Sequence, residues 1–493
     1  MENQKFESLE QLLHHPVFHH FGELCRIPHP SFQEKAISAA VYSWARQKGF
    51  ETWQDDWNNV FIRKPASPGY EERPVVMLQA HLDMVCQKAR GVEHDFARDP
   101  IHLELAGDIL STGGRTTLGA DDGIGVALAM ALLEDDSLPH PELEALFTTA
   151  EEEDMSGAQN VDASDFHARY LVNIDNAAER HSVTGSCGGF GVKFHLPVTW
   201  EAVPGQSLFY HLKVEGLQGG HSGEDIHRGR GNANIFLIRM LLGARKKMPL
   251  HLASLHGGTF RLAIPRDAEA VVMVPAAQKE EFLVAVDQVV KHLRAEYKAV
   301  AANLKMTVEL TEGPATGLVV SQDVTDKFIQ VLVLSPNGIS EMNAAIPTVV
   351  QSSDNLGEIR LEPEENRLVV VYEIRTSFRS KADYIWDKIH LLAQLVGGTC
   401  EKFAAYPGWP NDPDSKLTPQ VQQVYQDLFG ETMAATPIHS GLECGCLMEK
   451  RPELDAISLG PDCWDLHSPQ ERLSVSSTLR MYEFLKKLLA EIQ

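Results

Sequence analysis

Five residues of the types that bind metal ions stand out in this chain: His81, Asp121, Glu152, Asp175 and His467. All but Asp121 follow a short, largely apolar run, and such runs between Gly, Pro and Asp are typical of buried parallel strands. In open α/β sheets, ligands bind at the carboxyl ends of these strands. Two imidazoles and three carboxylates suit Zn²⁺ or Mn²⁺, whereas softer metals favour thiolates. The sequence therefore predicts a two-metal hydrolase site.

The residues around two of these candidates support that interpretation. Asp83 stands two positions after His81, so in an extended segment both side chains project from the same face. Metal-bound histidines usually donate their second N–H to a carboxylate, and Asp83 is predicted to orient His81 in this way. Asp121 opens a helical pattern between Gly119 and Gly123. It either caps that helix or uses its two oxygens to bridge two cations.

The acidic run 151–154 follows the largely apolar segment 143–147. Taken alone, four acidic residues would form a solvated turn, but their place after a predicted strand favours a metal site. One carboxylate can bind a metal while its neighbour takes a proton from the attacking water, whose pKa zinc lowers to ~7. We assign Glu152 as the ligand and Glu151 as the general base.

Length, charge and cysteine content narrow the function classes. With 493 residues, 43% of them hydrophobic, the chain should form at least two domains. A formal charge of −24 repels phosphate and argues against nucleic acid or an anionic membrane as a partner. Seven widely spaced cysteines fit a reducing compartment. No run reaches the ~20 apolar residues that span a bilayer, and the N-terminus does not resemble a signal peptide. We expect a cytoplasmic protein.

The texture of the sequence changes twice along the chain. Residues 1–189 and 399–493 alternate helical patterns with short apolar strands, which predicts an α/β catalytic domain in two parts, with a mostly parallel central sheet and flanking helices. Residues 190–398 combine alternating strands with long helical patterns and predict an inserted α+β domain. A strand followed by a helix near the end of each half suggests two related α+β units, with chance similarity as the alternative.

Several motifs resemble those of the bacterial aminoacyl-histidine dipeptidases, also called peptidase D or cytosol non-specific dipeptidases. The resemblance begins at residue 27 and covers nearly the whole chain. The wider family comprises co-catalytic dizinc peptidases whose α/β catalytic domain is interrupted by a lid domain, so residues 190–398 would form that lid. The matching motifs are Ile27-Pro28-His29-Pro30-Ser31, Gln79-Ala80-His81-Leu82-Asp83-Met84-Val85, Thr117-Leu118-Gly119-Ala120-Asp121, Gly219-Gly220-His221-Ser222-Gly223, Gly441-Leu442-Glu443-Cys444-Gly445 and His467-Ser468-Pro469.

The resemblance implies a place for each candidate ligand. Asp121 would bridge two metal ions. His81 and Asp175 would complete one site, and Glu152 and His467 would complete the other. The implied cofactors are two divalent metal ions, Zn²⁺ first, with Mn²⁺ or Co²⁺ as alternatives.

Three further residues gain catalytic roles from the same resemblance. Glu151 would activate the attacking water, and Asp83 would orient His81. His221, in the lid, would hydrogen-bond the developing oxyanion. In shorter relatives such a histidine comes from a partner subunit, whereas a doubled insert could supply it from the same chain. A homodimer therefore stays open as an assembly state and is not required for catalysis.

Two residues are candidates for binding the ends of the substrate. Arg375 follows the apolar run 368–374 and resembles the lid arginine that holds the substrate's terminal carboxylate; an exposed arginine at a strand end is the alternative. Glu443 could receive the substrate's ammonium group, with a buried structural carboxylate as the alternative. Leu262 stands where relatives usually carry asparagine, which bears on substrate specificity.

The leading functional hypothesis is a metallopeptidase that hydrolyses unblocked dipeptides, with Xaa-His dipeptides as one candidate class. An N-acyl amino acid amidohydrolase is the alternative within the same chemistry. A non-catalytic peptide-binding protein on the same fold is the alternative outside enzymes. The presence of all five ligands and of Glu151 argues against the last of these.

Overall fold

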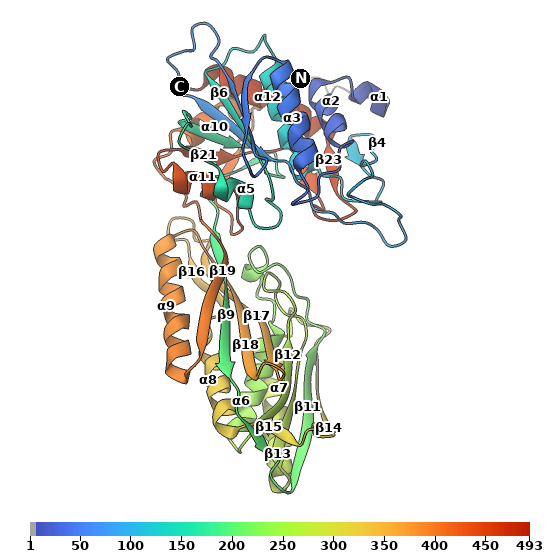
Figure 1. Cartoon of the computed structure of the whole chain (residues 1–493), viewed down its shortest axis with the longest axis vertical. Helices are drawn as coiled ribbons and strands as arrows, with labels where there is room; N and C mark the ends of the chain where they lie inside the picture. The colour runs from blue at the N-terminus through green and yellow to red at the C-terminus, as the bar shows by residue number, and fades with distance from the viewer. Residues whose placement is uncertain (1–5) are drawn as a thin grey trace. The chain divides into compact units, whose positions relative to one another are not determined.

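Two compact units make up the chain, of which the computed structural model describes residues 6–493 (Figure 1). The first unit contains the residues up to Ser186, together with Trp409–Pro437 and Leu442–Gln493. The second unit contains Cys187–Gly408 and Ile438–Gly441. Each unit has its own cluster of buried apolar side chains.

An eight-stranded sheet forms the centre of the first unit. Four neighbouring strands in it, β6, β3, β7 and β21, run parallel to one another. Every residue of these four strands is buried, which explains why they read as apolar runs rather than as alternating patterns. The predicted mostly parallel α/β fold is confirmed. In spatial order the strands are β1 (Glu51–Gln54), β2 (Val60–Lys64), β6 (Leu143–Thr148), β3 (Val76–His81), β7 (Tyr170–Asn173), β21 (Asp455–Ser458), β8 (His181–Val183) and β20 (Ala434–Thr436).

Helices pack against this sheet and supply the rest of the core. The helix that follows the Gly119 turn, α4, contacts β3, β6 and α2, and nearly all of its side chains are buried. A helix that is apolar all round is expected only where it is enclosed on all sides. The helices of the unit are α1 (Leu9–Leu12), α2 (Pro16–Leu24), α3 (Lys35–Gln47), α4 (Ala120–Glu134), α5 (Ser156–Asn160), α10 (Leu417–Phe429), α11 (Cys444–Lys450) and α12 (Val475–Glu491).

A small four-stranded sheet in the same unit carries the last candidate ligand. Its order is β22 (Cys463–Trp464), β23 (Arg472–Ser474), β5 (Ile109–Ser111) and β4 (Glu104–Ala106), and all pairs are antiparallel. His467 lies in the turn that joins β22 to β23. This hairpin therefore fixes where the imidazole can reach.

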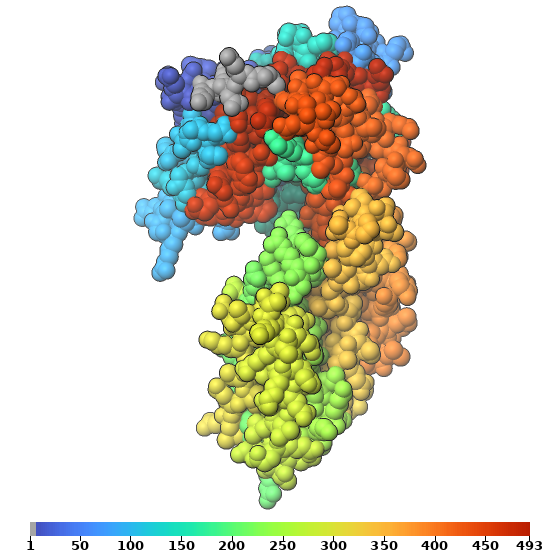
Figure 2. Space-filling model, turned by 180° about the vertical axis from the view of Figure 1, so that it is seen from behind, coloured from blue at the N-terminus to red at the C-terminus, as the bar shows by residue number. Residues whose placement is uncertain are grey.

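The second unit is built on a nine-stranded sheet whose pairs are all antiparallel, and the predicted α+β insertion is confirmed. Four helices pack on the sheet and share one core with it. Figure 2 shows this unit from behind, where the yellow-green to yellow segment around α7 forms much of the visible surface. The helices are α6 (Ala233–Arg245), α7 (Lys279–Glu296), α8 (Gln322–Leu334) and α9 (Arg379–Val396), with 3₁₀ turns η1 (Ile226–Arg228) and η2 (Ala276–Gln278).

The same strand–helix topology occurs twice in this sheet. The segments β11-α6-β12-β13-α7-β14 and β9-α8-β17-β18-α9-β19 both have the chain order βαββαβ and the spatial strand order 4-1-3-2. The second strand of one segment, β12, pairs with the second strand of the other, β17, so the two halves form one continuous sheet. The strands are β9 (Gly188–Pro197), β11 (Ser207–Glu215), β12 (His251–Gly257), β13 (Ala268–Pro275), β14 (Lys305–Thr311), β16 (Gly338–Met342), β17 (Val350–Glu362), β18 (Arg367–Thr376) and β19 (Thr399–Tyr406); β10 (Trp200–Ala202) and β15 (Leu318–Val320) form a separate pair.

The sequence pattern placed the end of the inserted domain at residue 398, but the next strand, β19, also belongs to the second unit. β19 pairs with β9 and completes the nine-stranded sheet of the second unit. No residue of β19 is fully buried, because it is an edge strand. It therefore lacks the buried pattern that would have linked it to the preceding strands.

Candidate metal centre and active site

The candidate metal ligands gather at the carboxyl ends of neighbouring strands. His81 is the last residue of β3, Asp175 lies just beyond β7, and Glu152 lies just beyond β6. His467 follows β21 by way of the β22–β23 turn. Because β6, β3, β7 and β21 are adjacent and parallel, their carboxyl ends share one edge of the sheet. Asp121 reaches the same edge from the first turn of α4.

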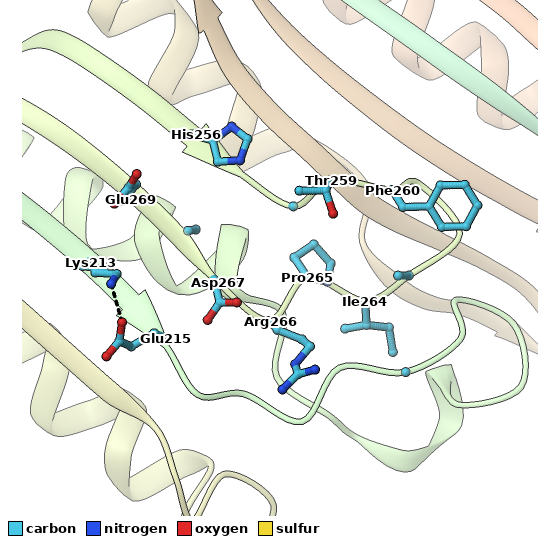
Figure 3. A pocket seen from close by; sticks show the side chains of 14 residues that line it. Lys213, Glu215, His256, Thr259, Phe260, Ile264, Pro265, Arg266, Asp267 and Glu269 are labelled. Carbon is cyan, nitrogen blue, oxygen red and sulfur yellow. Dashed lines mark ion pairs between the residues drawn. The ribbon is translucent and has the colours of Figure 1, made fainter. Parts of the chain in front are cut away.

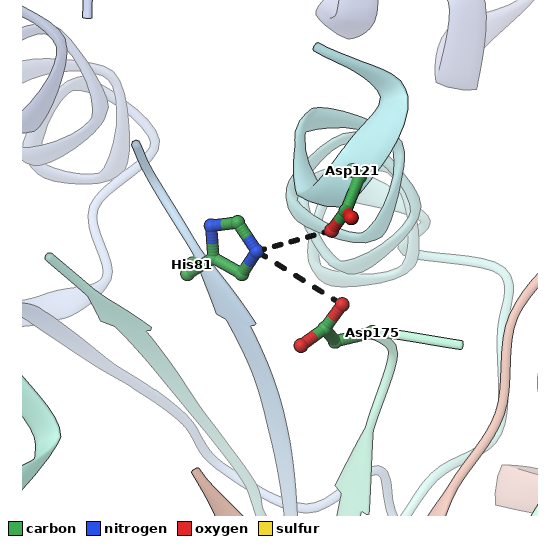
Figure 4. A group of neighbouring side chains, drawn as sticks. All are labelled: His81, Asp121 and Asp175. Carbon is green, nitrogen blue, oxygen red and sulfur yellow. Dashed lines mark hydrogen bonds and ion pairs between the residues drawn. The ribbon is translucent and has the colours of Figure 1, made fainter. Parts of the chain in front are cut away.

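His81, Asp121 and Asp175 form the first ligand group (Figure 4). Nε2 of His81 lies 3.2 Å from Oδ1 of Asp121 and 3.9 Å from Oδ1 of Asp175. One donor atom of each residue lies within 4.8 Å of the others. Zinc takes nitrogen and oxygen ligands at about 2 Å, so donors this far apart can contact one cation.

Asp121, Glu152 and His467 form the second ligand group. Nε2 of His467 lies 3.1 Å from Oδ2 of Asp121 and 3.1 Å from Oε2 of Glu152. Asp121 is thus common to both groups, with Oδ1 toward His81 and Oδ2 toward His467. This arrangement allows one carboxylate to contact two cations.

The carboxylates at this edge of the sheet lie close enough to repel one another, and bound cations would offset that repulsion. Burial raises the pKa of Asp175 well above its usual range, and the neighbouring Asp121 carboxylate raises it further. Oε1 of Glu152 is buried and, among the residues that the structure describes, has no hydrogen-bond partner. Imidazole and carboxylate are donor types that Zn²⁺, Mn²⁺ and Co²⁺ accept. The residues present therefore fit two divalent cations that share Asp121.

Glu151 lies beside the ligands without belonging to either group that contains Asp121. Its carboxylate, with that of Glu152, lies within 4.8 Å of a ring nitrogen of His81. Burial raises the pKa of Glu151 well above its usual range, and the Glu152 carboxylate adds to this effect. A carboxyl group with a raised pKa can both accept and return a proton near neutral pH.

Asp83 joins two parts of the site. Nδ1 of His81 lies 3.0 Å from the backbone oxygen of Asp83 and 3.4 Å from Oδ1 of its carboxylate. The same carboxylate accepts the backbone N–H groups of Glu151 at 3.0 Å and Glu152 at 3.2 Å, and the hydroxyl of Ser31 at 2.8 Å. Asp83 therefore contacts His81 and also fixes the turn that carries the proposed base.

Two buried carboxylates that support the site were not predicted from the sequence. Glu34, 3% exposed, accepts the N–H of Ala150 at 3.0 Å. Ala150 has a φ of +57° and immediately precedes Glu151, so Glu34 holds the backbone beside the proposed base. Glu471, 2% exposed, holds the segment that leads into Asp121. Glu471 lies two residues beyond the His467-Ser468-Pro469 motif, but its partners lie about 350 residues earlier in the chain. No local pattern indicates such a contact.

Arg375 is buried in the second unit, at 3% exposure, so the alternative of an exposed strand-end arginine is wrong. Its guanidinium donates to Ser222 Oγ at 3.3 Å and to Tyr406 Oη at 2.9 Å. Nη2 also lies 3.3 Å from Nε2 of His221. The carboxylate of Glu373 lies 3.8 Å from Nη2, beyond hydrogen-bonding distance. The structure thus brings Arg375 and His221 together within one chain.

Glu443 is fully buried in the first unit. Oε2 accepts hydrogen bonds from Gln79 Nε2 and Thr148 Oγ1, both at 2.6 Å, and thereby links the carboxyl ends of β3 and β6. Burial raises the pKa of Glu443 to about 7. Oε2 thus has a structural contact, whereas Oε1 is buried and has no hydrogen-bond partner among the described residues.

A cavity of about 600 Å³ lies in the second unit, beside the loop that contains Ile264 and Pro265 (Figure 3). Several charged side chains line it, and two of them, Lys213 and Glu215, are paired at 2.5 Å. Within the described part of the chain, no group of potential metal ligands lies in this lining. The cavity is therefore a feature distinct from the metal centre.

None of the helices in residues 6–493 is long and apolar enough to cross a bilayer.

Comparisons with known proteins agree on one family. The sequence profile of peptidase family M20/M25/M40 matches residues 77–491. The chain is 37% identical over 485 residues to the cytosol non-specific dipeptidase of Escherichia coli K12, covering 98% of this chain and 99% of the relative. Its fold is similar to that of aminoacylhistidine dipeptidase from Vibrio alginolyticus, with a TM-score of 0.88 and 34% identity over 97% of this chain and 96% of the other. Aminopeptidase PepT from Bacillus cereus, at 13% identity and a TM-score of 0.55, covers 97% of this chain and 98% of its own and shares the fold alone. With a profile match over most of its length and a full-length relative at 37% identity, this chain belongs to peptidase family M20/M25/M40.

Proposed function

We propose that this metal-dependent peptidase hydrolyses unblocked dipeptides, Xaa-His dipeptides among them, at a centre of two divalent cations. The observation that carries the proposal is the carboxylate of Asp121, with one oxygen 3.2 Å from His81 and the other 3.1 Å from His467. It joins two ligand groups into one site. The activities named for the Escherichia coli and Vibrio alginolyticus relatives support the dipeptide as substrate.

The ligand assignment follows from the two groups. His81 and Asp175 would hold one cation, Glu152 and His467 the other, and Asp121 both. When bound, such cations polarise the scissile carbonyl and lower the pKa of water. Zn²⁺ is the first candidate, with Mn²⁺ and Co²⁺ as alternatives of the same donor preference.

The remaining steps belong to the side chains around the ligands. A carboxylate oxygen of Glu151 takes a proton from the attacking water and returns it to the nitrogen of the leaving amine. Asp83 holds the ring of His81 in position. In the second unit, His221 donates a hydrogen bond to the oxygen that becomes negative when the carbonyl is attacked.

Arg375 is proposed to bind the terminal carboxylate of the substrate. The contacts described above pair its guanidinium with two hydroxyls and an imidazole nitrogen, while Glu373 lies 3.8 Å away and is shared with Arg261. A buried cation without a directly hydrogen-bonded anion is costly, and a substrate carboxylate would offset that cost. Glu443, buried and already hydrogen-bonded, supports the strand ends in this proposal rather than the substrate's ammonium group.

The ends of the substrate give the experiment that tests this function. A free dipeptide should be cleaved well, whereas the same dipeptide with an amidated C-terminus should be a poor substrate. Arg375→Ala should lower kcat/KM for the free acid by about 10- to 100-fold, because a hydrogen bond to a charged group contributes ~1.5–3 kcal/mol. Steady-state kinetics on the paired substrates measures both effects.

Arg367→Ala is the matched control, since Arg367 starts the same strand but pairs with Glu362 and Glu365 at the surface. It should leave the preference for the free acid intact. Undiminished cleavage of amidated dipeptides by the wild type would exclude the proposed role of Arg375. Acylating the amine tests the class of enzyme: faster cleavage of the N-acyl substrate would identify an amidohydrolase instead.

His221→Ala should lower kcat by roughly 10²–10³ and leave the metal content unchanged, which is the range for losing one oxyanion donor. His211→Ala is the control, because His211 lies on β11 of the same unit and pairs with Glu269 of β13 at 3.0 Å. A kcat near that of the wild type would show that His221 only packs. Mixing His221→Ala with Glu151→Gln chains tests the source of the histidine. No recovery, with mixed assemblies verified by native mass spectrometry, is expected if each chain uses its own His221.

A further inference from the structure

One buried carboxylate outside the ligand groups accepts four consecutive backbone N–H groups. Oε2 of Glu471 accepts those of Leu118 at 2.7 Å and Gly119 at 3.2 Å. Oε1 accepts those of Ala120 at 2.9 Å and Asp121 at 3.3 Å. Glu471 is 2% exposed, so these hydrogen bonds are shielded from water. The last of the four N–H groups belongs to the residue that joins the two ligand groups.

The local backbone explains why a carboxylate suits this position. The first N–H groups of a helix have no partner within the helix, and a negative charge near that end is stabilising. Gly119 adopts φ +71°, a conformation that favours glycine, and this turn lets successive N–H groups converge on one anion. A Cβ at Gly119 would lie 3.0 Å from the sulfur of Met84, so the turn is also closely packed. The entry to α4 is therefore held from outside by Glu471.

The other end of the same contact is the turn that carries His467. The N–H of Glu471 donates to the carbonyl of Ser468 at 3.1 Å, and Ser468 Oγ donates to the carbonyl of Asp465 at 2.7 Å. His467 itself adopts φ +59°, which is uncommon for a residue other than glycine. Immediately after Glu471, Arg472 begins β23 and pairs with β5. The turn is thus closed on itself, and Glu471 is its last residue.

We propose that Glu471 is a positioning residue that fixes Asp121 relative to His467 and thereby sets the affinity of the centre for its metal ions. This inference rests on the proposed ligand roles of those two residues. Within residues 6–493, the hydrogen bonds of the Glu471 carboxylate go to backbone N–H groups; it acts through the backbone of Asp121 on one side and through the His467 turn on the other. Residues about 350 positions apart in the chain are brought into register by one carboxylate.

An amide cannot replace this carboxylate. In Glu471→Gln the side-chain nitrogen would be a donor facing two backbone donors, so only one oxygen would remain to accept. The entry to α4 and the His467 turn would then move independently. Losing a partner that orients a metal ligand typically lowers metal affinity by about 10- to 100-fold.

The test compares Glu471→Gln with Asp455→Asn. Asp455 is also a buried carboxylate that accepts N–H groups at the start of a helix, from Lys416 at 2.6 Å and Leu417 at 3.0 Å. It begins β21, at the opposite end from the carboxyl edge. Both variants should lower the Tm. Metal-free chains titrated with Zn²⁺ against a chromogenic chelator should show the 10- to 100-fold loss of affinity in Glu471→Gln only.

Excess Zn²⁺ supplies a second readout. It should restore most of the kcat of Glu471→Gln with the KM for the dipeptide little changed, a recovery that general destabilisation would not give. Zn²⁺ affinity equal to that of the wild type would overturn the inference. If Glu471→Gln does not fold, Glu471→Asp provides the same measurement, because it keeps the charge but is one methylene too short to reach all four N–H groups.

The metal content of the wild type and of His467→Ala distinguishes a failure of this inference from a failure of the proposed function. The wild type should bind two ions per chain, and His467→Ala should bind fewer. A wild type that does not bind two ions would refute the proposed metal centre itself. A wild type that binds two, together with Glu471→Gln of equal affinity, would refute only the role of Glu471.

Discussion

Removing divalent cations should abolish dipeptide hydrolysis, and adding Zn²⁺, Mn²⁺ or Co²⁺ back should restore it. Three carboxylates and two imidazoles converge at one edge of the sheet, and none of them can polarise the scissile carbonyl as a cation does. Dialysis against a chelator, followed by elemental analysis and activity measurements during metal readdition, tests this. Active wild type should approach two metal ions per chain.

A single ligand change sharpens that expectation. His467→Ala deletes a donor from the second group and should lower the metal content, whereas His102→Ala, an exposed histidine of the same unit, should not. The readdition series also identifies the metal that gives the highest kcat. A fully active preparation without metal would contradict the whole assignment of the centre.

Glu151→Gln should lower kcat by roughly 10²–10⁴, the usual contribution of a positioned general base, and should keep the metal ions. Glu151 is absent from both ligand groups that share Asp121, so its loss leaves their donors in place. An amide of the same size cannot accept the proton from water. Kinetics with elemental analysis on the same preparation separates loss of the base from loss of metal.

Glu153→Gln provides the matched control, because Glu153 belongs to the same acidic turn but is exposed. It should retain activity close to that of the wild type. If Glu151→Gln and His467→Ala lost metal to the same extent, the proposed division between base and ligand would be wrong. If Glu151→Gln kept full activity, another group would have to accept the proton.

The carboxyl-end rule for parallel strands made much of this site predictable. His81 ends a fully buried strand, and Glu152 and Asp175 each follow one; runs of apolar residues indicate such strands in the sequence. The rule needs two features of the sequence: the apolar strand and the polar residue at or just beyond its end. Their assembly into two groups around Asp121 depends on which strands become neighbours, and only the sheet order reveals that.

Residues whose role depends on distant contacts were harder to predict. Arg375 lies near the end of β18, where the sequence alone left both exposure and burial open; its burial results from packing within the second unit. The edge strand β19 carries no buried residue and so gave no sign that it continues the antiparallel sheet. Glu34 and Glu471 hold backbone segments 116 and about 350 residues away. Such contacts leave no periodic signal in either partner's sequence.

The joined βαββαβ halves of the second unit have a consequence for how activity depends on dilution. His221 lies in the loop after β11 of one half, and Arg375 lies on β18 of the other, yet they meet at 3.3 Å within one polypeptide. Where two such halves belong to separate subunits, mass action makes the complete arrangement scarcer as the protein is diluted. Here one polypeptide carries both halves, so His221 and Arg375 face each other at a fixed effective concentration. Specific activity should therefore stay constant down to concentrations at which any oligomer has dissociated.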